Sequence, residues 1–126
     1  MKTLIFGCKG QLGRDLMRLF GDIGEVRGYD LPEVDIADES QIGALVSGFA
    51  PQWVINAAAH TDVEAAEDNP EPAYRVNETG ARVVADAAAQ AGAEVVYYST
   101  DYVFGGLSND PYEPDAPLAP LGVYAQ

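Results

Sequence analysis

Short apolar runs alternate along the chain with longer segments in which apolar residues recur at helical spacing. The first run covers residues 2–6, and the helical pattern that follows it stops at Gly21. Its apolar positions are Leu12, Leu16, Leu19 and Phe20. A second run, residues 25–30, ends at Asp30. The pattern therefore predicts a strand, a helix and a second strand.

A second helix is predicted after Pro32. The sequence Asp38-Glu39-Ser40-Gln41 is similar to a capping box, and the apolar face that follows stops before Pro51. This face consists of Ile42, Leu45, Val46 and Phe49. Residues 53–57 then form a buried third strand.

A long third helix is predicted to begin after Asn69-Pro70, with the asparagine as cap, and to end near Gly92. Its inward stripe contains mostly small residues that allow close packing on a sheet: Ala73, Val76, Gly80, Val83, Val84 and Ala87. Residues 94–98 are predicted to form the fourth strand.

The segment from Gly105 to Pro120 contains two adjacent glycines and four prolines, which exclude a helix and predict a long surface excursion. A functional loop and a flexible connector fit this composition equally well. Residues 121–126 are typical of the first turn of a helix, so we expect the chain to be cut short.

Alternating strands and helices predict an α/β fold of the Rossmann type, with a doubly wound parallel sheet and strand order 3-2-1-4. Ligands of such sheets bind at the carboxyl ends of the strands, here at the switch between the first and fourth strands. The glycine turn, Asp30, residues 56–61 and residues 99–101 all fall at that edge.

The turn after the first strand has the form GxxGxxG. Gly7 allows a sharp turn, Gly10 allows close approach of a diphosphate, and Gly13 allows the next helix to pack closely on the sheet. The helix that begins near Gln11 directs free N–H groups at the diphosphate, and Lys9 adds a positive charge. Asp30 has the spacing of a carboxylate that binds a ribose diol.

The composition fits a single domain, since the chain has 126 residues of which 48% are hydrophobic. Its one cysteine, Cys8, excludes an internal disulfide and favours a reducing compartment, and we expect it to be an inert filler rather than a reactive thiol. No segment resembles a signal peptide or a membrane span, so a cytoplasmic protein is predicted.

The net charge of −13 lacks the basic footprint that a nucleic acid or an anionic membrane would need, so neither is expected as a partner. The acidity fits ordinary solubility, which we favour, or adaptation to high salt.

Four segments together resemble the dTDP-4-dehydrorhamnose reductase family of extended short-chain dehydrogenases, over the whole chain. They are Gly7-Cys8-Lys9-Gly10-Gln11-Leu12-Gly13, Val54-Ile55-Asn56-Ala57-Ala58-Ala59, Arg75-Val76-Asn77 and Tyr98-Ser99-Thr100-Asp101-Tyr102-Val103-Phe104. Members reduce the 4-keto group of a dTDP-sugar with NADPH or NADH. Some form homodimers linked by a metal, so Mg²⁺ is a further expectation for the full-length protein.

The resemblance implies two catalytic residues. Thr100 matches the hydroxyl residue that binds the substrate carbonyl, and Tyr124 matches the tyrosine of a YxxxK motif. A lysine four residues after Tyr124 would tune its phenol, but the sequence ends at Gln126. Residues 1–126 are thus expected to be the N-terminal part of an NAD(P)-binding Rossmann domain, without the substrate-binding part and inactive alone.

The candidate cofactor-binding residues come from four segments of the chain. They are Gly7, Lys9, Gly10, Gln11, Leu12, Gly13, Asp30, Asp35, Ile36, Ala57, Ala58, Ala59, Thr61 and Ser99. Asp35 and Ile36 resemble the pair beside the adenine, although a solvated loop aspartate is an equal alternative. Asp30 favours NAD over NADP, since Arg27 should point to the opposite face of its strand.

Two positions depart from the family pattern. His60 stands where a tyrosine is usual, and Gly105 where an aspartate is common. His60 is expected to be structural or solvated rather than a contact of the cofactor. Two alternatives to the reductase stay open: another nucleotide-sugar epimerase or dehydratase, and a regulatory subunit that binds a dinucleotide without catalysis.

Overall fold

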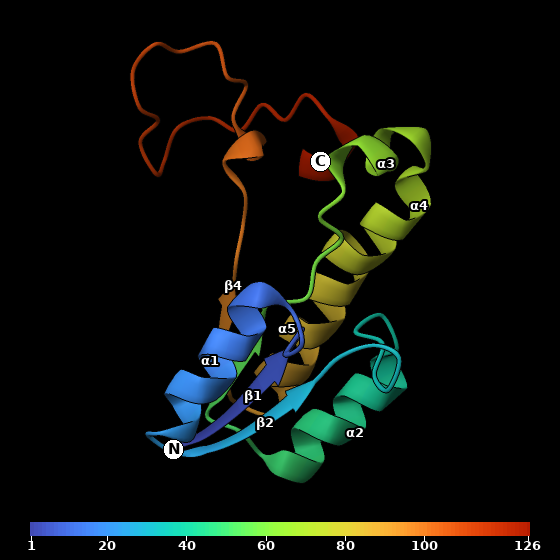
Figure 1. The fold of residues 1–126 in the computed structure, drawn as a ribbon, viewed down its shortest axis with the longest axis vertical. Helices are drawn as coiled ribbons and strands as arrows, with labels where there is room; N and C mark the ends of the chain where they lie inside the picture. Colours follow the sequence, from blue (N-terminus) through green and yellow to red (C-terminus); the bar gives the residue numbers. More distant parts are fainter.

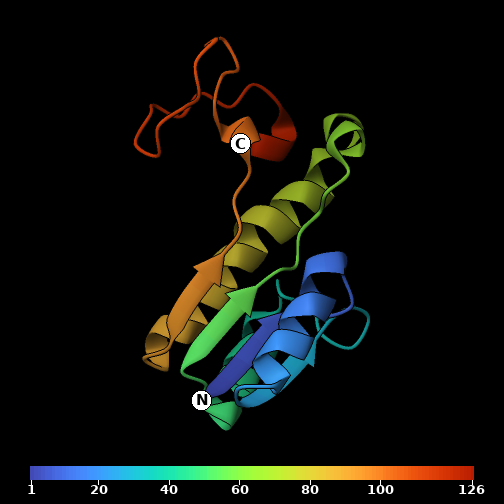
Figure 2. The ribbon, with the colours of Figure 1, turned by 60° about the vertical axis from the view of Figure 1, so that its left-hand side comes forward.

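The computed structural model describes all 126 residues, and its centre is a parallel sheet of four short strands. Figure 2 shows the strands side by side with their carboxyl ends pointing the same way. They are β1 (Lys2–Phe6), β2 (Glu25–Tyr29), β3 (Trp53–Asn56) and β4 (Glu94–Tyr97). The predicted parallel α/β sheet of Rossmann type is confirmed.

The predicted strand order 3-2-1-4 is wrong, because the observed order is β2-β1-β3-β4. Val54 and Ile55 of β3 are almost fully buried, so this strand takes a central place beside β1. The strand β2 carries the exposed residues Glu25 and Arg27, which suit an edge. The switch point therefore lies between β1 and β3, because the connection after β1 leads to β2 on one side and the connection after β3 leads to β4 on the other.

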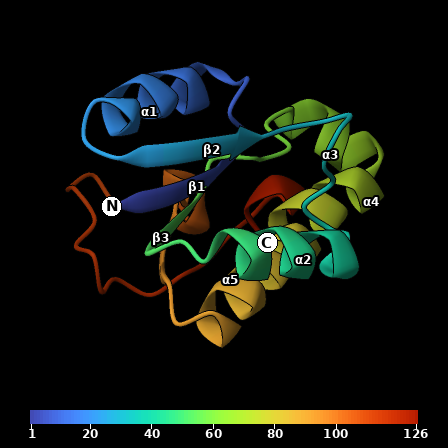
Figure 3. The ribbon, with the colours of Figure 1, turned by 90° about the horizontal axis from the view of Figure 1, so that it is seen from below.

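Helices cover both faces of the sheet, as Figure 3 shows in end view. On one face α1 (Gln11–Gly21) packs Leu16 against Ile5 and Ile55. On the other face α2 (Glu39–Phe49) and α5 (Ala81–Gln90) enclose the larger core. That core consists of Leu4, Phe6, Val34, Ile36, Ile42, Val46, Phe49, Val54, Val83, Val84, Ala87 and Ala88.

The predicted ends of the first two helices are confirmed. The Asp38 carboxylate accepts the N–H of Gln41 at 2.9 Å, which is one half of a capping box, and α2 ends at Phe49 before Pro51. In α1, Leu16 is buried, whereas Leu12 and Leu19 are 41% and 57% exposed. Only part of the predicted apolar stripe of α1 therefore faces the sheet.

The long helix is divided into three parts. It comprises α4 (Pro70–Ala73), a π-helix η1 (Tyr74–Gly80) and α5. Asn69 occupies the cap position, but its side chain accepts no capping hydrogen bond. A short helix not predicted from the sequence, α3 (Val63–Asp68), precedes α4 and is capped by Asp62. None of the helices has the length and apolar character needed to cross a membrane.

The chain after β4 extends away from the sheet, as Figure 1 shows. It contains two short 3₁₀ turns, η2 (Asp101–Val103) and η3 (Val123–Ala125), and η3 packs against α3 and α4. The predicted excursion between them has no helix. Tyr112 orders part of it, because its hydroxyl accepts the N–H groups of Leu107 and Ser108 and its ring stacks on Phe104.

Candidate functional site

The glycine turn after β1 is held closely against the end of β3. Gly7 has a φ of +80°, and a Cβ there would lie 2.5 Å from the Ala58 nitrogen. A Cβ on Gly13 would overlap the Gly7 carbonyl, so this glycine lets α1 pack on the turn, whereas the sequence analysis expected it to allow close packing on the sheet. Gly10 is more open, since the only atom near its Cβ position is the Gly7 oxygen at 3.3 Å.

The start of α1 carries free hydrogen-bond donors. The first bond of the helix runs from the Arg14 N–H to the Gly10 carbonyl over 3.1 Å, and the N–H groups of Gln11, Leu12 and Gly13 have no partner within the chain. These N–H groups and the open side of Gly10 fit a diphosphate, which is negatively charged and approaches the backbone closely. The residues present thus fit a dinucleotide.

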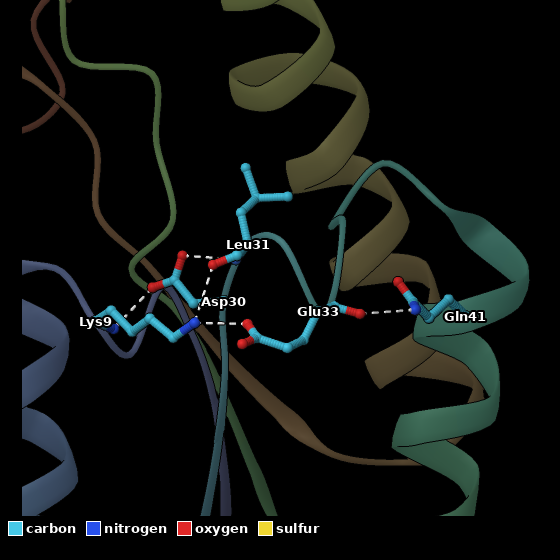
Figure 4. A network of polar contacts seen from close by, with 5 residues as sticks. All are labelled: Lys9, Asp30, Leu31, Glu33 and Gln41. Atoms are coloured by element: carbon cyan, nitrogen blue, oxygen red, sulfur yellow. Dashed lines mark hydrogen bonds and ion pairs between the residues drawn. The ribbon is translucent and has the colours of Figure 1, made fainter.

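Asp30, at the end of β2, links the glycine turn to the next loop (Figure 4). Its carboxylate accepts the N–H of Lys9 at 2.7 Å and the N–H of Leu31 at 2.8 Å. The Lys9 ammonium donates to the Leu31 carbonyl and pairs with Glu33 at 2.6 Å. Gln41 donates to the Glu33 carbonyl. The Lys9 charge is therefore matched by Glu33 and by the nearby Asp30 carboxylate.

Arg27 lies away from this network. Its guanidinium pairs with Glu25 at 3.3 Å and lies over the ring of Phe49, 4.3 Å from the centroid. Strand alternation predicted this orientation, so Arg27 does not offset the Asp30 charge.

Asp35 and Ile36 attach the loop after β2 to the long helix. The Asp35 carboxylate accepts the Ala37 N–H and forms an ion pair with Arg75 at 2.6 Å. This hydrogen bond to Arg75 lowers the pKa of Asp35 and raises that of Arg75. The Ile36 side chain packs where a Cβ on Gly80 would lie. The Asp35 side chain is thus engaged within the chain, while its segment remains at the pocket wall.

The ion pair predicts a pH-dependent loss of stability in Asp35→Asn. Because the folded-state pKa of Asp35 is lowered, its contribution is complete above the ordinary carboxyl pKa near 4 and is lost as the pH falls through the lowered value. We expect a Tm about 2–4 °C below that of the wild type at pH 7. Thermal melts from pH 7 to pH 2 should converge; a constant gap would contradict the assignment.

The loop after β3 is fixed by Asn77 in the π-helix. The His60 N–H donates to Asn77 Oδ1 at 2.8 Å, and Asn77 Nδ2 donates to the His60 carbonyl at 3.0 Å. The hydroxyl of Tyr97 donates to the Asn77 carbonyl in the same π-helix. Burial raises the pKa of Tyr97, which keeps this phenol protonated. Asn77 therefore fixes the loop after β3 at His60, a function that sequence reasoning did not assign.

Thr100 and Tyr124 line the same hollow at the far end of the site. The Thr100 hydroxyl accepts the N–H of Tyr102 at 3.2 Å, which fixes the start of η2. The ring of Tyr124 meets the ring of Tyr102 edge to face, with centroids 6.0 Å apart. The two residues that the resemblance paired are thus brought together although 24 positions separate them in the sequence.

Three adjoining hollows form one groove along the carboxyl edge of the sheet. The first, about 360 Å³, extends from Gly7 to Asp30, Asp35 and Ile36. The second, about 610 Å³, holds Gln11, Leu12 and Thr61 and shares Gly10 and Ala57–Ala59 with the first. The third, about 250 Å³, contains Thr100 and shares Ser99 and Tyr124 with the second.

Every predicted site residue except Gly13 lines this groove, and Gly13 lies beneath it. Sequence reasoning missed several lining residues: Tyr29, Val34, Val76, Asn77, Tyr97 and Tyr98. Val34 and Val76 could have been found from their apolar character beside Ile36 and Asn77. Asn77 and Tyr98 stand in the segments that carry the family resemblance, whereas Tyr29 and Tyr97 carried no local signal.

The inert role expected for Cys8 is supported by its surroundings, whereas the role expected for His60 stays a prediction. His60 lines the first hollow, and its Nδ1 is buried without a hydrogen-bond partner. Burial, assisted by the Asp30 charge, raises the pKa of the Cys8 thiol, which disfavours the reactive thiolate. No group of three or more His, Cys, Asp or Glu side chains is gathered as in a metal site.

The sheet order, the glycine turn and the groove at the β1/β3 switch point define a Rossmann-type α/β protein with its ligand site at the carboxyl edge. Residues 1–126 match the family model described as the RmlD substrate binding domain. The chain belongs to this family.

Individual relatives agree with this assignment. The chain is 37% identical to the dTDP-4-dehydrorhamnose reductase of Escherichia coli K12, over 100% of its own length and 44% of the relative's. The Bacillus anthracis dTDP-4-dehydrorhamnose reductase in complex with NADP superposes with a TM-score of 0.94 at 37% identity, over 98% of this chain and 45% of that one. The chain thus spans less than half the length of these relatives.

A nucleotide-sugar epimerase is also similar. The Thermus thermophilus UDP-glucose 4-epimerase in complex with NAD has a TM-score of 0.88 at 25% identity, over 99% of this chain and 46% of that one. The fold is therefore shared by proteins whose names give different reactions.

Proposed function

We propose that the chain forms the cofactor-binding part of a reductase that converts dTDP-4-dehydro-L-rhamnose into dTDP-L-rhamnose with NADPH or NADH. The observation that carries the proposal is the single groove that joins the glycine turn and Asp30 at one end to Thr100 and Tyr124 at the other. The reductases among the relatives support the choice of substrate. The part that binds most of the sugar nucleotide would lie outside residues 1–126.

Two side chains of this part would act on the substrate carbonyl. The Thr100 hydroxyl binds the keto oxygen, and the Tyr124 phenol gives its proton to that oxygen. The dinucleotide, when bound, supplies the hydride. A phenol has an ordinary pKa near 10 and needs a nearby cation to act as an acid at neutral pH. The chain contains no lysine after Lys9, so we expect residues 1–126 alone to be inactive.

The direct test uses a full-length protein that includes this chain, mixed with dTDP-4-dehydro-L-rhamnose and NADPH or NADH. Oxidation of the cofactor supports the proposal, and no oxidation despite cofactor binding would overturn it and favour a regulatory subunit. Interconversion of UDP-glucose and UDP-galactose without net cofactor oxidation would instead identify an epimerase, which the similarity to the Thermus protein makes the second candidate.

Cofactor choice is testable on this chain alone. The Asp30 carboxylate would repel the 2′-phosphate of NADPH, whereas a ribose diol can donate to it. We expect Asp30→Asn to raise the affinity for NADPH relative to NADH by about tenfold. This is the effect expected from removing the repulsion of one close charge pair in a partly solvated site. Fluorescence titration with both reduced cofactors measures the ratio, with Glu25→Gln at the other end of β2 as control. An unchanged ratio would refute the assignment.

Three further expectations belong to the full-length protein. The unpaired cysteine favours a cytoplasmic location. The acidic charge opposes nucleic acid and anionic membranes as partners, which leaves the dTDP-sugar as the proposed ligand besides the cofactor. The homodimer and its Mg²⁺ rest on the family resemblance and stay predictions.

A further inference from the structure

The turn that carries Tyr124 is held from behind by helix α3. The N–H of Val123 donates to Glu67 Oε1 at 2.7 Å, across 56 positions of sequence. Figure 1 shows the end of the chain beside α3 and α4. Helix α3 is itself fixed at its start, since the Asp62 carboxylate accepts the Ala65 N–H at 2.9 Å. The carboxylate of Glu67 therefore connects η3 to a capped helix.

Gly122 leaves the space that this carboxylate occupies. A Cβ on Gly122 would lie 2.8 Å from Glu67 Oε1. The φ of Gly122 is −102°, a value that any residue adopts, so the backbone conformation does not require glycine here. What the missing side chain provides is room for the Glu67 carboxylate.

Two weaker contacts complete the attachment of the turn. The Tyr74 hydroxyl donates to Gln126 Oε1 at 2.9 Å, and the Tyr102 ring meets the Tyr124 ring edge to face. Glu67 supplies the one charged group among these contacts, and hydrogen bonds to charged acceptors are about twice as strong as neutral ones. The Glu67 contact is thus the one whose loss should move Tyr124 most.

We propose that Glu67 is a positioning residue for Tyr124, an inference that rests on the proposed role of Tyr124 as proton donor. By holding the Val123 N–H, the Glu67 carboxylate sets where the phenol lies relative to Thr100. A displacement of about 1 Å at a reacting group can cost about 10²-fold in rate. Glu67 does not line the groove, so its loss should leave cofactor binding intact.

The kinetic test compares variants of the full-length protein that includes this chain. We expect Glu67→Ala to lower kcat about 10- to 100-fold, with KM for the dTDP-sugar and the Kd for NADH changed less than about twofold. Glu67→Gln keeps an acceptor oxygen and should recover most of the rate. Glu64→Ala is the matched control, because Glu64 lies on the same helix and its side chain makes no hydrogen bond or ion pair.

A double-mutant cycle shows whether the effect passes through this contact. Gly122→Ala should lower kcat much as Glu67→Ala does, because the new methyl group displaces the carboxylate. The double variant should be no slower than the slower single variant. Three results would each overturn the proposal: additive losses of kcat in the double variant, a loss of affinity for NADH that matches the fall in kcat, or a wild-type kcat in Glu67→Ala.

Amide exchange of residues 1–126 separates this inference from the proposed function. Hydrogen exchange of the Val123 amide, followed by NMR, should be about tenfold faster in Glu67→Ala than in Glu64→Ala. If the full-length protein reduces no dTDP-sugar, the reductase proposal fails and the positioning role for that reaction fails with it, whatever the exchange. If reduction occurs but exchange is unchanged, the reductase stands and the Glu67 inference is wrong.

Discussion

Replacing Gly7 by alanine is expected to destabilise the folded chain by about 2–6 kcal/mol, from about 1–3 for the backbone strain and about 1–3 for overpacking. Its φ of +80° disfavours a side chain, and the new Cβ would lie 2.5 Å from the Ala58 nitrogen and 2.6 Å from the Ala57 carbonyl carbon. Both partners are backbone atoms at the end of β3, so relief requires β1 and β3 to separate. Urea denaturation measures the loss.

Gly43→Ala is the matched control for this substitution. Gly43 lies within α2, and no atom lies within 4 Å of its Cβ position. The change should therefore stabilise the chain by about 0.5–1 kcal/mol, the difference in helix propensity. If Gly7→Ala unfolded at the same urea concentration as the wild type, the close approach of the turn to β3 would be refuted.

The largest expected effect on catalysis is that of Tyr124→Phe, which should lower kcat of the full-length protein by about 10²- to 10⁴-fold. The substitution removes only the hydroxyl, so the edge-to-face contact with Tyr102 and the lining of the groove remain. Cofactor affinity should not change, since the ring of Tyr124 still lines the hollow that it shares with Gly10, Gln11 and Leu12. Stopped-flow measurement of cofactor oxidation gives the rate.

Tyr112→Phe provides the control for the loss of a phenolic hydroxyl. Tyr112 lies in the excursion after η2, outside the groove, where its hydroxyl accepts two backbone N–H groups. We expect kcat within about twofold of the wild type, because no reacting group is touched. If Tyr124→Phe kept the wild-type rate, the proton would have to come from another group.

Local patterns predicted the elements better than their arrangement. The local sequence predicted where α1 and α2 begin and end, because capping and helix termination depend on adjacent residues. The strand order depends instead on which strands must be buried between two neighbours. The apolar β3 lies inside the sheet, and the more polar β2 lies at its edge. The helix α3 has six residues and one buried side chain, Ala66, which is too little for a periodic signal.

The candidate site divides in the same way. Residues in local motifs, such as Gly10, Asp30 and Thr100, were placed correctly at the edge of the sheet. Asn77 and Glu67 act through partners that are 17 and 56 positions away, and no spacing rule connects such residues. Contacts of this kind become visible only when the chain is folded.

The long helix made of α4, η1 and α5 contacts the ligand site through its π-helix η1 and the core through α5. A π turn has one residue more than an α turn, so the faces before and after it are rotated relative to each other. The wide turn directs Asn77 at the loop that borders the groove, while Val83, Val84 and Ala87 meet the core below it. Substitutions before Gly80 can thus alter the ligand site, while the residues after Gly80 keep their packing against the strands.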